Sequence, residues 1–472
     1  MGAIPRPLAD RSIYLRYSCR SIALVSQGQS YFDVEFRYQS GPLDRLELRL
    51  YATPRCRRDC PGDQRDVPGL NVFSVCHGVS KAPIGECRCF PPPRDLASVT
   101  PMRITLVIST FTAGGAERVM SVMANYWAER GEDMTLITLS PQPNDWYTLD
   151  RRIKRVALDA LSSSAHVVQA LRENVRRILR LRRALRGAQP EVIVSFLDKT
   201  NVLTLMASWG LGIPVVISER NDPREYNIGL AWSVLRSVLY RRADAIVVQS
   251  CAIRDWALKL PGIKATYVIP NPMRQTKSES KQASKPHASA HAIVAMGRLV
   301  EQKGFDILIE AFSRCAAKHS DWSLVILGEG PRRASLQTVA EDLGIGERVH
   351  LVGQVREPAT ILKGADLFVL SSRYEGFPNA LVEAMACQLP VVSTDCSSGG
   401  PRDIIRDGVD GILVPPKDVA ALANAMERLM GDQTERQRLG SRAGEVVERF
   451  SLNRVMKLWD DLLTGIARLS HA

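Results

Sequence analysis

The 472-residue sequence lacks two kinds of apolar segment that would carry a protein into or across a membrane. Its first twenty residues are charged throughout and contain no apolar core of a secretory signal. Its longest apolar run, at 202–217, is interrupted by Gly210, Gly212 and Pro214, which is typical of a helix followed by a buried strand. We therefore expect a cytoplasmic protein.

Common nucleotide-binding and nucleic-acid-binding signatures are also missing. The Gly-rich segment at 110–120 lacks the G-x-G-x-x-G spacing of Rossmann oxidoreductases, and no acidic residue ends a second strand about twenty residues later. Zinc-finger, helix–turn–helix and aromatic–basic patterns are absent, so a nucleic-acid-binding protein is only an alternative. The net charge of +12 still calls for an anionic partner, such as a phosphorylated substrate or an acidic membrane surface.

Most of the chain has the composition and rhythm of an α/β protein. Apolar residues make up 45% and charged residues 24%, and the length favours two domains. Short β-branched runs alternate with amphipathic helices, which predicts two doubly wound Rossmann-like domains that face a cleft. The predicted parts are an N-terminal domain at 102–271, a Ser-, Lys- and Gln-rich linker at 272–291, a C-terminal domain at 292–452, and a last helix at 453–472 that packs back on the first domain.

Residues 1–101 differ from the rest because they show little helical or strand periodicity. They hold most of the cysteines, but the spacings of Cys56 with Cys60 and of Cys87 with Cys89 do not match a paired zinc knuckle, so we expect no metal site. We interpret this segment as an irregular, non-native extension with Met102 as the true initiator. A chain that begins at Met102 should then keep full activity.

Two cations lie at the start of the second domain. Arg298 follows a predicted strand, and Lys303 lies on the loop that enters the next helix. An Arg and a Lys beside the amino end of a helix suit a diphosphate, because charged side chains and free backbone amides both donate to it. The alternative is a pair of solvated surface cations.

Two acids flank a turn later in the same domain. Glu375 precedes a helix and Glu383 lies on its second turn, so both carboxylates face one ligand space. Carboxylates accept hydrogen bonds from sugar hydroxyls, and the helix amino end between them favours phosphate. The alternative is a capping acid and an exposed helical Glu. The residues between them that form the turn and begin the helix are Gly376, Phe377, Pro378 and Asn379.

These motifs, in this order and together with TFTAGGAERVM at 110–120, resemble the donor site of glycosyltransferase family 4, which has the GT-B fold. The resemblance covers 102–472 and implies a retaining transferase that uses a nucleotide diphosphate sugar, by default a UDP-sugar. It implies a hexosyl or N-acetylhexosaminyl group as the transferred sugar. The chain has no Asp-x-Asp triplet, so we expect no metal and no cofactor, with cations and amides meeting the leaving-group charge.

The resemblance also assigns roles to the donor residues. Backbone amides at Gly114 and Gly115 approach the donor phosphates, while Arg298 and Lys303 hold the diphosphate. The resemblance assigns Glu375 to the hydroxyls of the transferred sugar. Glu375, Arg298 and Lys303 together form the predicted catalytic set. The resemblance assigns Glu383 to the ribose. The backbone amides of the turn that precedes Glu383 are expected to contact the sugar and the phosphate.

The acceptor is expected on the first domain, at strand ends that face the cleft. These segments resemble a branch of the family that acts on lipid-linked oligosaccharides, lipopolysaccharide or exopolysaccharide precursors, so we expect a saccharide acceptor on a polyprenyl diphosphate. Simple capping of strand ends is the alternative, and the general base stays open because the His of many relatives is absent. The candidates are Asp198, Glu219 (also a candidate proton acceptor), Arg220 and Asn221.

The helix predicted at 167–186 is basic and amphipathic. We expect its apolar stripe to pack on the sheet and its arginines to contact anionic lipid headgroups, which predicts a peripheral protein on the inner face of the cytoplasmic membrane. The alternative for this helix is a covering helix with a solvated basic face. The alternative for the whole chain is a catalytically inactive sugar-nucleotide-binding protein. The predicted stripe is Val168, Leu171, Val175, Ile178 and Leu185.

Overall fold

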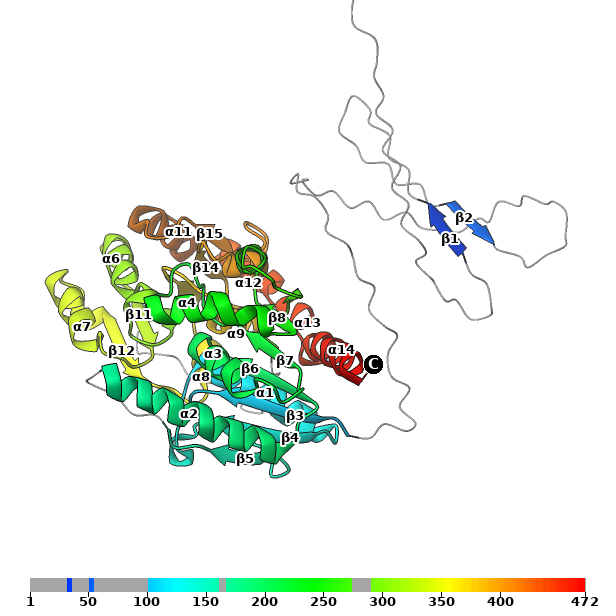
Figure 1. Cartoon of the computed structure of the whole chain (residues 1–472). Coiled ribbons are helices and arrows are strands. Elements are labelled where there is room, and N and C mark those ends of the chain that lie inside the picture. Colours follow the sequence, from blue (N-terminus) through cyan, green and yellow to red (C-terminus); the bar gives the residue numbers. More distant parts are fainter. Residues whose placement is uncertain (1–31, 36–50, 55–100, 161–166, 274–289, 472) are drawn as a thin grey trace, which may run out of the picture. The chain divides into compact units, whose positions relative to one another are not determined.

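The computed structural model describes residues 32–35, 51–54, 101–160, 167–273 and 290–471 (Figure 1). The cysteines considered for zinc and most of the predicted linker lie outside the described residues. In the unit formed by residues 1–86, strand β1 (Phe32–Glu35) pairs with β2 (Tyr51–Pro54) in antiparallel fashion. The rest of the description concerns the second unit, residues 87–472.

The first domain is built on a seven-stranded, entirely parallel sheet of order β5-β4-β3-β6-β7-β8-β9. Its central strands are fully buried because helices cover both faces, which explains their continuous apolar sequences. Strand β5 escapes sequence prediction because KRVA begins with two charged residues and so lacks the apolar run of the other strands. The strands are β3 (Arg103–Ile108), β4 (Asp133–Thr138), β5 (Lys154–Ala157), β6 (Val192–Phe196), β7 (Val215–Ser218), β8 (Ala245–Val248) and β9 (Thr266–Val268).

Alternate residues of these strands contact different helices. Leu106 lies in a core with α1 and the final helix, whereas its neighbour Val107 packs with α2, α3, α4 and α5 on the other face. This alternation is the two-residue period of a strand. The helices are α1 (Gly115–Glu129), α2 (Val167–Ala188), α3 (Asp198–Ala207), α4 (Leu230–Leu239) and α5 (Cys251–Ala257).

The second domain repeats the design with a six-stranded parallel sheet of order β12-β11-β10-β13-β14-β15. In both sheets the chain starts at a central strand, moves to one edge and then reverses, which is the doubly wound order predicted from the sequence. The strands are β10 (His291–Met296), β11 (Trp322–Leu327), β12 (Val349–Gly353), β13 (Leu367–Leu370), β14 (Val391–Thr394) and β15 (Ile412–Val414). The predicted fold is confirmed.

Helices cover both faces of this second sheet, and the last one, α14, returns to the first domain. Trp459 and Leu463 of α14 are buried in the same core as β3 and α1, and the indole of Trp127 donates a hydrogen bond of 2.7 Å to Asp460. The helices are α6 (Phe305–Ala316), α7 (Arg333–Asp342), α8 (Pro358–Leu362), α9 (Asn379–Ala386), α10 (Gly400–Ile404), α11 (Val419–Gly431), α12 (Gln433–Ala443), α13 (Val446–Arg449) and α14 (Leu452–His471).

The predicted apolar stripe of α2 needs a correction. Ile178 and Leu185 pack on the sheet together with Leu181, but Val175 is 47% exposed. At about 100° per residue, Leu181 and Leu185 lie to one side of Ile178 around the helix, whereas Val175 lies to the other side, at the border with solvent. The side chains of Val168 and Leu171 are outside the described residues.

Among the described helices, none combines the length and the sustained apolar composition needed to cross a bilayer.

Candidate functional site

A cavity of about 2340 Å³ lies between the two domains. It is lined by loops that follow the carboxyl ends of strands in both sheets, which is where doubly wound folds bind ligands. Every predicted donor residue except Pro378 lines it, as do three of the four predicted acceptor residues, Asp198, Arg220 and Asn221. The structure therefore brings together motifs that are up to a few hundred residues apart in the sequence.

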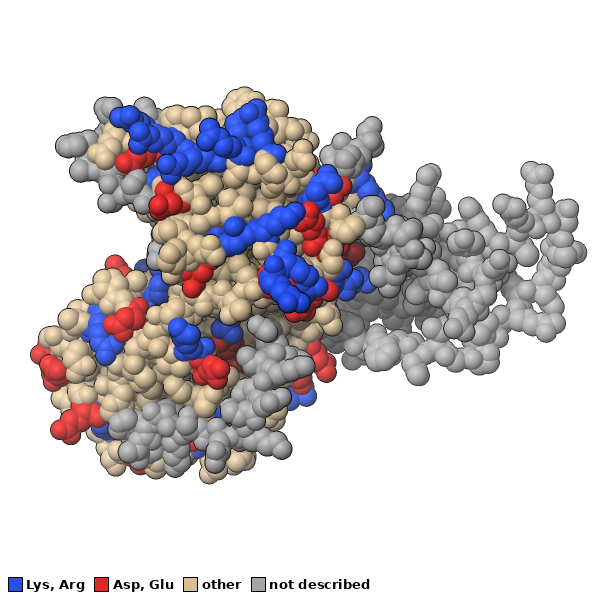
Figure 2. All heavy atoms as spheres, turned by 90° about the horizontal axis from the view of Figure 1, so that it is seen from below, with Lys and Arg blue, Asp and Glu red and all other residues tan. Residues whose placement is uncertain are grey.

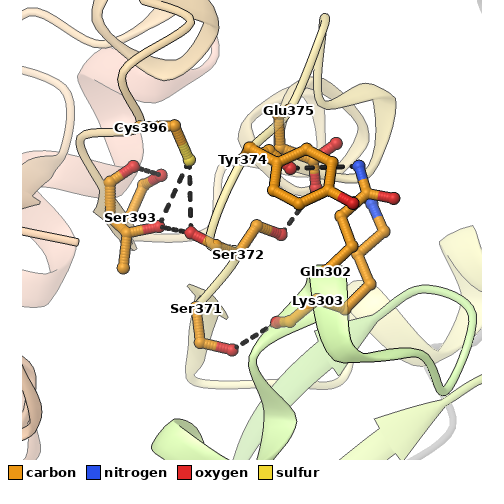
Figure 3. Close-up of polar contacts among 9 residues, drawn as sticks. Gln302, Lys303, Ser371, Ser372, Tyr374, Glu375, Ser393 and Cys396 are labelled. Carbon is orange, nitrogen blue, oxygen red and sulfur yellow. Dashed lines mark hydrogen bonds and ion pairs between the residues drawn. The ribbon is translucent and has the colours of Figure 1, made fainter. Parts of the chain in front are cut away.

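The two central donor motifs meet in an ion pair between Lys303 and Glu375 (Figure 3). The Nζ of Lys303 donates to Oε1 of Glu375 at 2.5 Å, and the hydroxyl of Ser372 donates to the same oxygen at 2.6 Å. Glu375 is only 5% exposed, and these two donors satisfy one of its buried oxygens. The cation and the acid are thus held together before any ligand enters.

The backbone around this pair is tightly specified. Lys303 ends a short 3₁₀ turn, and Gly304 follows with φ +61 in the left-handed region. A Cβ on Gly304 would lie 2.2 Å from the carbonyl oxygen of Ser371, so no other residue fits without displacement. The hydroxyl of Ser371 in turn donates to the carbonyl of Lys303 at 2.9 Å.

Further hydrogen bonds tie the loop that carries Glu375 to the loop that carries Lys303 and to the end of β14. The amide of Gln302 donates to the carbonyl of Tyr374 at 3.0 Å, and the hydroxyl of Thr394 donates to the carbonyl of Ser372 at 2.6 Å. Arg373 adds a bidentate contact to Asp306 at the start of α6. Sequence reasoning missed these supports, because their partners come from loops that only the fold brings together.

Arg298 differs from Lys303 in being exposed at the edge of the cavity. Within the described residues its guanidinium makes no hydrogen bond or ion pair. An Arg with five unengaged donors beside a cavity is suited to a bidentate contact with a phosphate.

The Gly-rich loop lies where β3 turns into α1. Gly114 caps the helix and Gly115 is its first residue, so the first amides of α1 begin at the cavity. A Cβ on Gly114 would lie 2.1 Å from a carboxylate oxygen of Glu117, whose other oxygen accepts a hydrogen bond of 2.7 Å from Thr110. The phenol of Tyr147 donates to the carbonyl of Gly114 at 3.0 Å, and burial raises the pKa of Tyr147 to about 12, so it stays a donor.

Glu383 has a partner that the sequence did not suggest. It forms an ion pair with Arg118 of α1, across the cavity in the other domain. Burial alone would lower the pKa of Arg118, but the charge and hydrogen bond of Glu383 raise it. A ribose hydroxyl that binds the Glu383 carboxylate must therefore share it with the Arg118 guanidinium or displace that guanidinium.

A chain of amides also crosses between the domains. Asn379 accepts from Asn271 at 2.8 Å and donates to the carbonyl of Gly115 at 3.3 Å, while Asn271 accepts from Arg220 at 2.5 Å. A Cβ on Gly376 would lie 2.3 Å from the carbonyl oxygen of Arg220. The predicted turn thus needs glycine because backbones of both domains meet there.

Arg220 is a more structural residue than predicted. Its guanidinium carbon lies 3.5 Å from the centre of the Phe196 ring, and burial lowers its pKa. Within the described residues its Nε and Nη2 atoms have no hydrogen-bond partner. It lines the cavity but is anchored at the contact between the domains.

Glu219 is a correction to the predicted acceptor set. It is 1% exposed, does not line the cavity, and accepts a hydrogen bond of 2.5 Å from the phenol of Tyr240. Burial, followed by the nearby charge of Asp198, raises the pKa of Glu219 to about 7, while Arg236 offsets this only in part. Its carboxylate lies in the core of the first domain, away from the residues that line the cavity, so this arrangement gives no support to a direct contact with an acceptor.

Asp198 reaches the cavity through a strained turn. Leu197, the residue before it, has φ +76, a left-handed conformation that costs a non-glycine residue on the order of 1–3 kcal/mol. The Asp198 carboxylate accepts a hydrogen bond of 2.6 Å from the amide of Lys199. Such strain is typical of a turn that has to present a side chain to a ligand.

In the described parts of the chain no group of three His, Cys, Asp or Glu side chains is arranged to hold a metal ion.

Known proteins match both domains. Residues 114–272 match the family model described as glycosyl transferase 4-like domain, and residues 276–446 match the model described as glycosyl transferases group 1. Among curated proteins, the chain is similar to a GalNAc-alpha-(1->4)-GalNAc-alpha-(1->3)-diNAcBac-PP-undecaprenol alpha-1,4-N-acetyl-D-galactosaminyltransferase from Campylobacter jejuni. The two are 26% identical over 366 residues, which cover 77% of this chain and 99% of the relative.

Two further similarities point the same way. A lipopolysaccharide core biosynthesis glycosyltransferase, LpsE, from Rhizobium meliloti is 29% identical over 75% of this chain and 96% of its own length. Among solved structures, Anabaena Alr3699/HepE in complex with UDP and glucose superimposes with a TM-score of 0.62 at 18% identity, covering 77% of this chain and all of that one. At that identity the structural likeness concerns the fold.

Proposed function

We propose that this chain, which belongs to the glycosyltransferases with a 4-like first domain and a group 1 second domain, transfers a hexosyl or N-acetylhexosaminyl group from a UDP-sugar. The family resemblance and the GT-B fold are confirmed, and relatives act in lipopolysaccharide and lipid-linked glycan synthesis. The observation that carries the proposal is the Lys303–Glu375 pair beside the unengaged Arg298, at a cavity lined by both domains.

In this proposal the donor diphosphate binds Arg298 and Lys303. A phosphate that approaches Lys303 competes with Glu375 for its ammonium group, and the released carboxylate then accepts hydrogen bonds from hydroxyls of the transferred sugar. The amino ends of α1 and α9 add backbone donors from opposite sides. The two cations take the place that a metal ion holds in transferases with an Asp-x-Asp triplet, which this sequence lacks.

We propose that transfer retains the anomeric configuration, as the family resemblance implies. The bond from the anomeric carbon to the phosphate oxygen breaks, the bond to the acceptor oxygen forms on the same face, and the acceptor proton passes to the leaving phosphate. Burial of Glu219 against Tyr240 favours this route over a side-chain base at that position.

The proposed acceptor is a saccharide on a polyprenyl diphosphate. The Campylobacter relative is named for an undecaprenol-linked acceptor, and it aligns over nearly its whole length. The face on which α2 lies carries a row of Lys and Arg in Figure 2, and the outward arginines of α2 suit anionic headgroups. We therefore place the protein at the inner face of the cytoplasmic membrane.

Two measurements test the donor side of this proposal. Thermal shift with a panel of nucleotide sugars should identify the donor, since a ligand at a hundred times its Kd stabilises the protein by about 2.7 kcal/mol. Slow hydrolysis of that donor without acceptor should follow, and Arg298→Ala should weaken both the shift and the hydrolysis. Binding without hydrolysis would instead indicate an inactive sugar-nucleotide-binding protein, and no shift with any nucleotide sugar would contradict the proposal.

A further inference from the structure

Helix α4 is amphipathic in the reverse of the usual sense. Its solvent face is apolar, because Leu230 is 84% exposed, Val234 55% and Val238 47%. These residues recur every four positions and therefore form one stripe along the helix. The charged residue of the helix, Arg236, is turned inward and is only 8% exposed.

The inward arginine has a structural reason. Its guanidinium carbon lies 5.1 Å from the centre of the Trp256 ring, and its charge acts on the buried Glu219 carboxylate. The core needs this cation to balance a buried acid, so α4 cannot simply be rotated to bury its apolar stripe. A contiguous apolar stripe on a folded protein marks an interaction surface.

The stripe belongs to a larger surface that is strongly basic. Helix α3 packs against both α2 and α4, and all three share one core on the same face of the first sheet. On α2, the side chains of Val175 and Leu179 are 47% and 59% exposed. The exposed arginines around them are Arg172, Arg176, Arg180, Arg183 and Arg186, and Figure 2 shows the basic row on the side where α2 lies.

We propose that the outer faces of α4 and α2 dock on an anionic phospholipid bilayer, with the apolar residues at the acyl boundary and the arginines at the headgroups. The combination of exposed Leu and Val with flanking Arg is the chemistry of an interfacial helix. A second copy of the chain is a poor occupant, because its matching surface offers apolar side chains and exposed arginines rather than the anionic groups that the α2 arginines require. Charge complementarity therefore selects lipid.

The docking surface borders the candidate site. Arg177 of α2 and Trp232 of α4 line the cavity, together with Tyr226 just before α4. A cavity that opens beside a bilayer can receive the saccharide of an amphiphilic acceptor whose lipid stays in the membrane. This part of the inference rests on the proposed function and deepens it, since it gives the route by which a lipid-linked acceptor enters.

Flotation with lipid vesicles tests the surface. The wild-type protein should float with vesicles of phosphatidylcholine mixed with phosphatidylglycerol, and a triple variant Leu230→Ser, Val234→Ser and Val238→Ser should bind them at least ~10-fold more weakly, since burying even one Leu or Val is worth about that factor. The difference should persist at high salt, which screens only the arginines. Arg176→Gln with Arg183→Gln should reduce the preference for anionic over neutral vesicles.

The matched control is Leu343→Ser, which removes an isolated exposed Leu on the second domain and should float like the wild type. Melting curves and size-exclusion chromatography exclude unfolding as the cause. Flotation of the triple variant at wild-type levels would overturn the proposal. An oligomeric wild-type protein whose triple variant is monomeric would also overturn it.

Activity separates this inference from the proposed function. The triple variant should hydrolyse donor at the wild-type rate but glycosylate a vesicle-embedded acceptor at least ~10-fold more slowly, because its acceptor arrives from the membrane. If the wild-type protein does not hydrolyse the donor, the proposed transferase function is contradicted. The flotation result would still test the membrane-docking surface. Equal rates on embedded acceptor for both proteins would overturn delivery from the bilayer.

Discussion

The donor loops of the second domain and the strand ends of the first domain look alike in sequence but differ in the structure. In the second domain, Arg298, Lys303 and Glu375 all reach the cavity. In the first domain, Asn221 lines the cavity, whereas Glu219, two residues earlier, is directed into the core. The comparison teaches that a polar residue just after a strand lies near a site, while the path of the loop and its packing decide whether the side chain faces the cavity or the core.

The largest effect is expected from Lys303. Replacing it by Ala removes the cation that the proposal sets against the leaving phosphate, and kcat should fall roughly 10²-fold or more. Steady-state kinetics checks this, with Lys318→Ala as control because that lysine forms an exposed ion pair with Glu427 away from the cavity. A Lys303→Ala enzyme with the wild-type kcat would contradict the role proposed for the Lys303 cation at the leaving phosphate.

Glu219 should affect stability through pH. Its pKa is about 7 in the folded chain and 4.5 in the unfolded one, so the folded state binds more protons between these values and stability falls as pH rises through that window. The loss should approach roughly 3 kcal/mol above pH 7, at 1.36 kcal/mol per pKa unit. Glu219→Gln should flatten this dependence in urea titrations.

If Glu219→Gln instead lowers donor affinity as much as a donor-site variant does, the prediction is contradicted. Glu219 would then belong to the binding site and not to the core.

Glu383 and Arg118 sharpen the comparison across the cavity. Glu383→Gln should raise the donor KM about tenfold, as expected for a hydrogen bond to a charged group. Arg118→Gln should lower the donor KM or leave it unchanged, because it frees Glu383 for the ribose. If both variants raise the donor KM equally, Arg118 contacts the donor rather than competing with it.

The smallest effect is expected from Asn221. Asn221→Ala should raise the acceptor KM only about threefold and leave the donor KM unchanged, since one neutral hydrogen bond contributes about 1 kcal/mol or less. Asn227→Ala, in the same loop region but outside the cavity lining, is the control. A change confined to the donor KM would place Asn221 on the other side of the site.

Much of the architecture followed from local patterns. Continuous β-branched runs identified every strand of both sheets except β5, whose sequence KRVA begins with two charged residues and therefore shows no apolar run. Gly376 marked a place where the backbone of the other domain comes too close for a side chain. Contacts such as Arg118 with Glu383 escaped notice, because 265 residues separate them and neither is unusual alone.

The sequence by itself therefore determined the two doubly wound domains and the positions of the motifs predicted to bind the donor, since periodicity, glycine positions and charged motifs are local properties. Only the tertiary structure decided the partner of each charge, the inward turn of Glu219 and Arg236, and the outward apolar stripe of α4. These depend on which helices and strands pack together. A side chain's neighbours across a domain boundary leave no mark on the residues beside it in the chain.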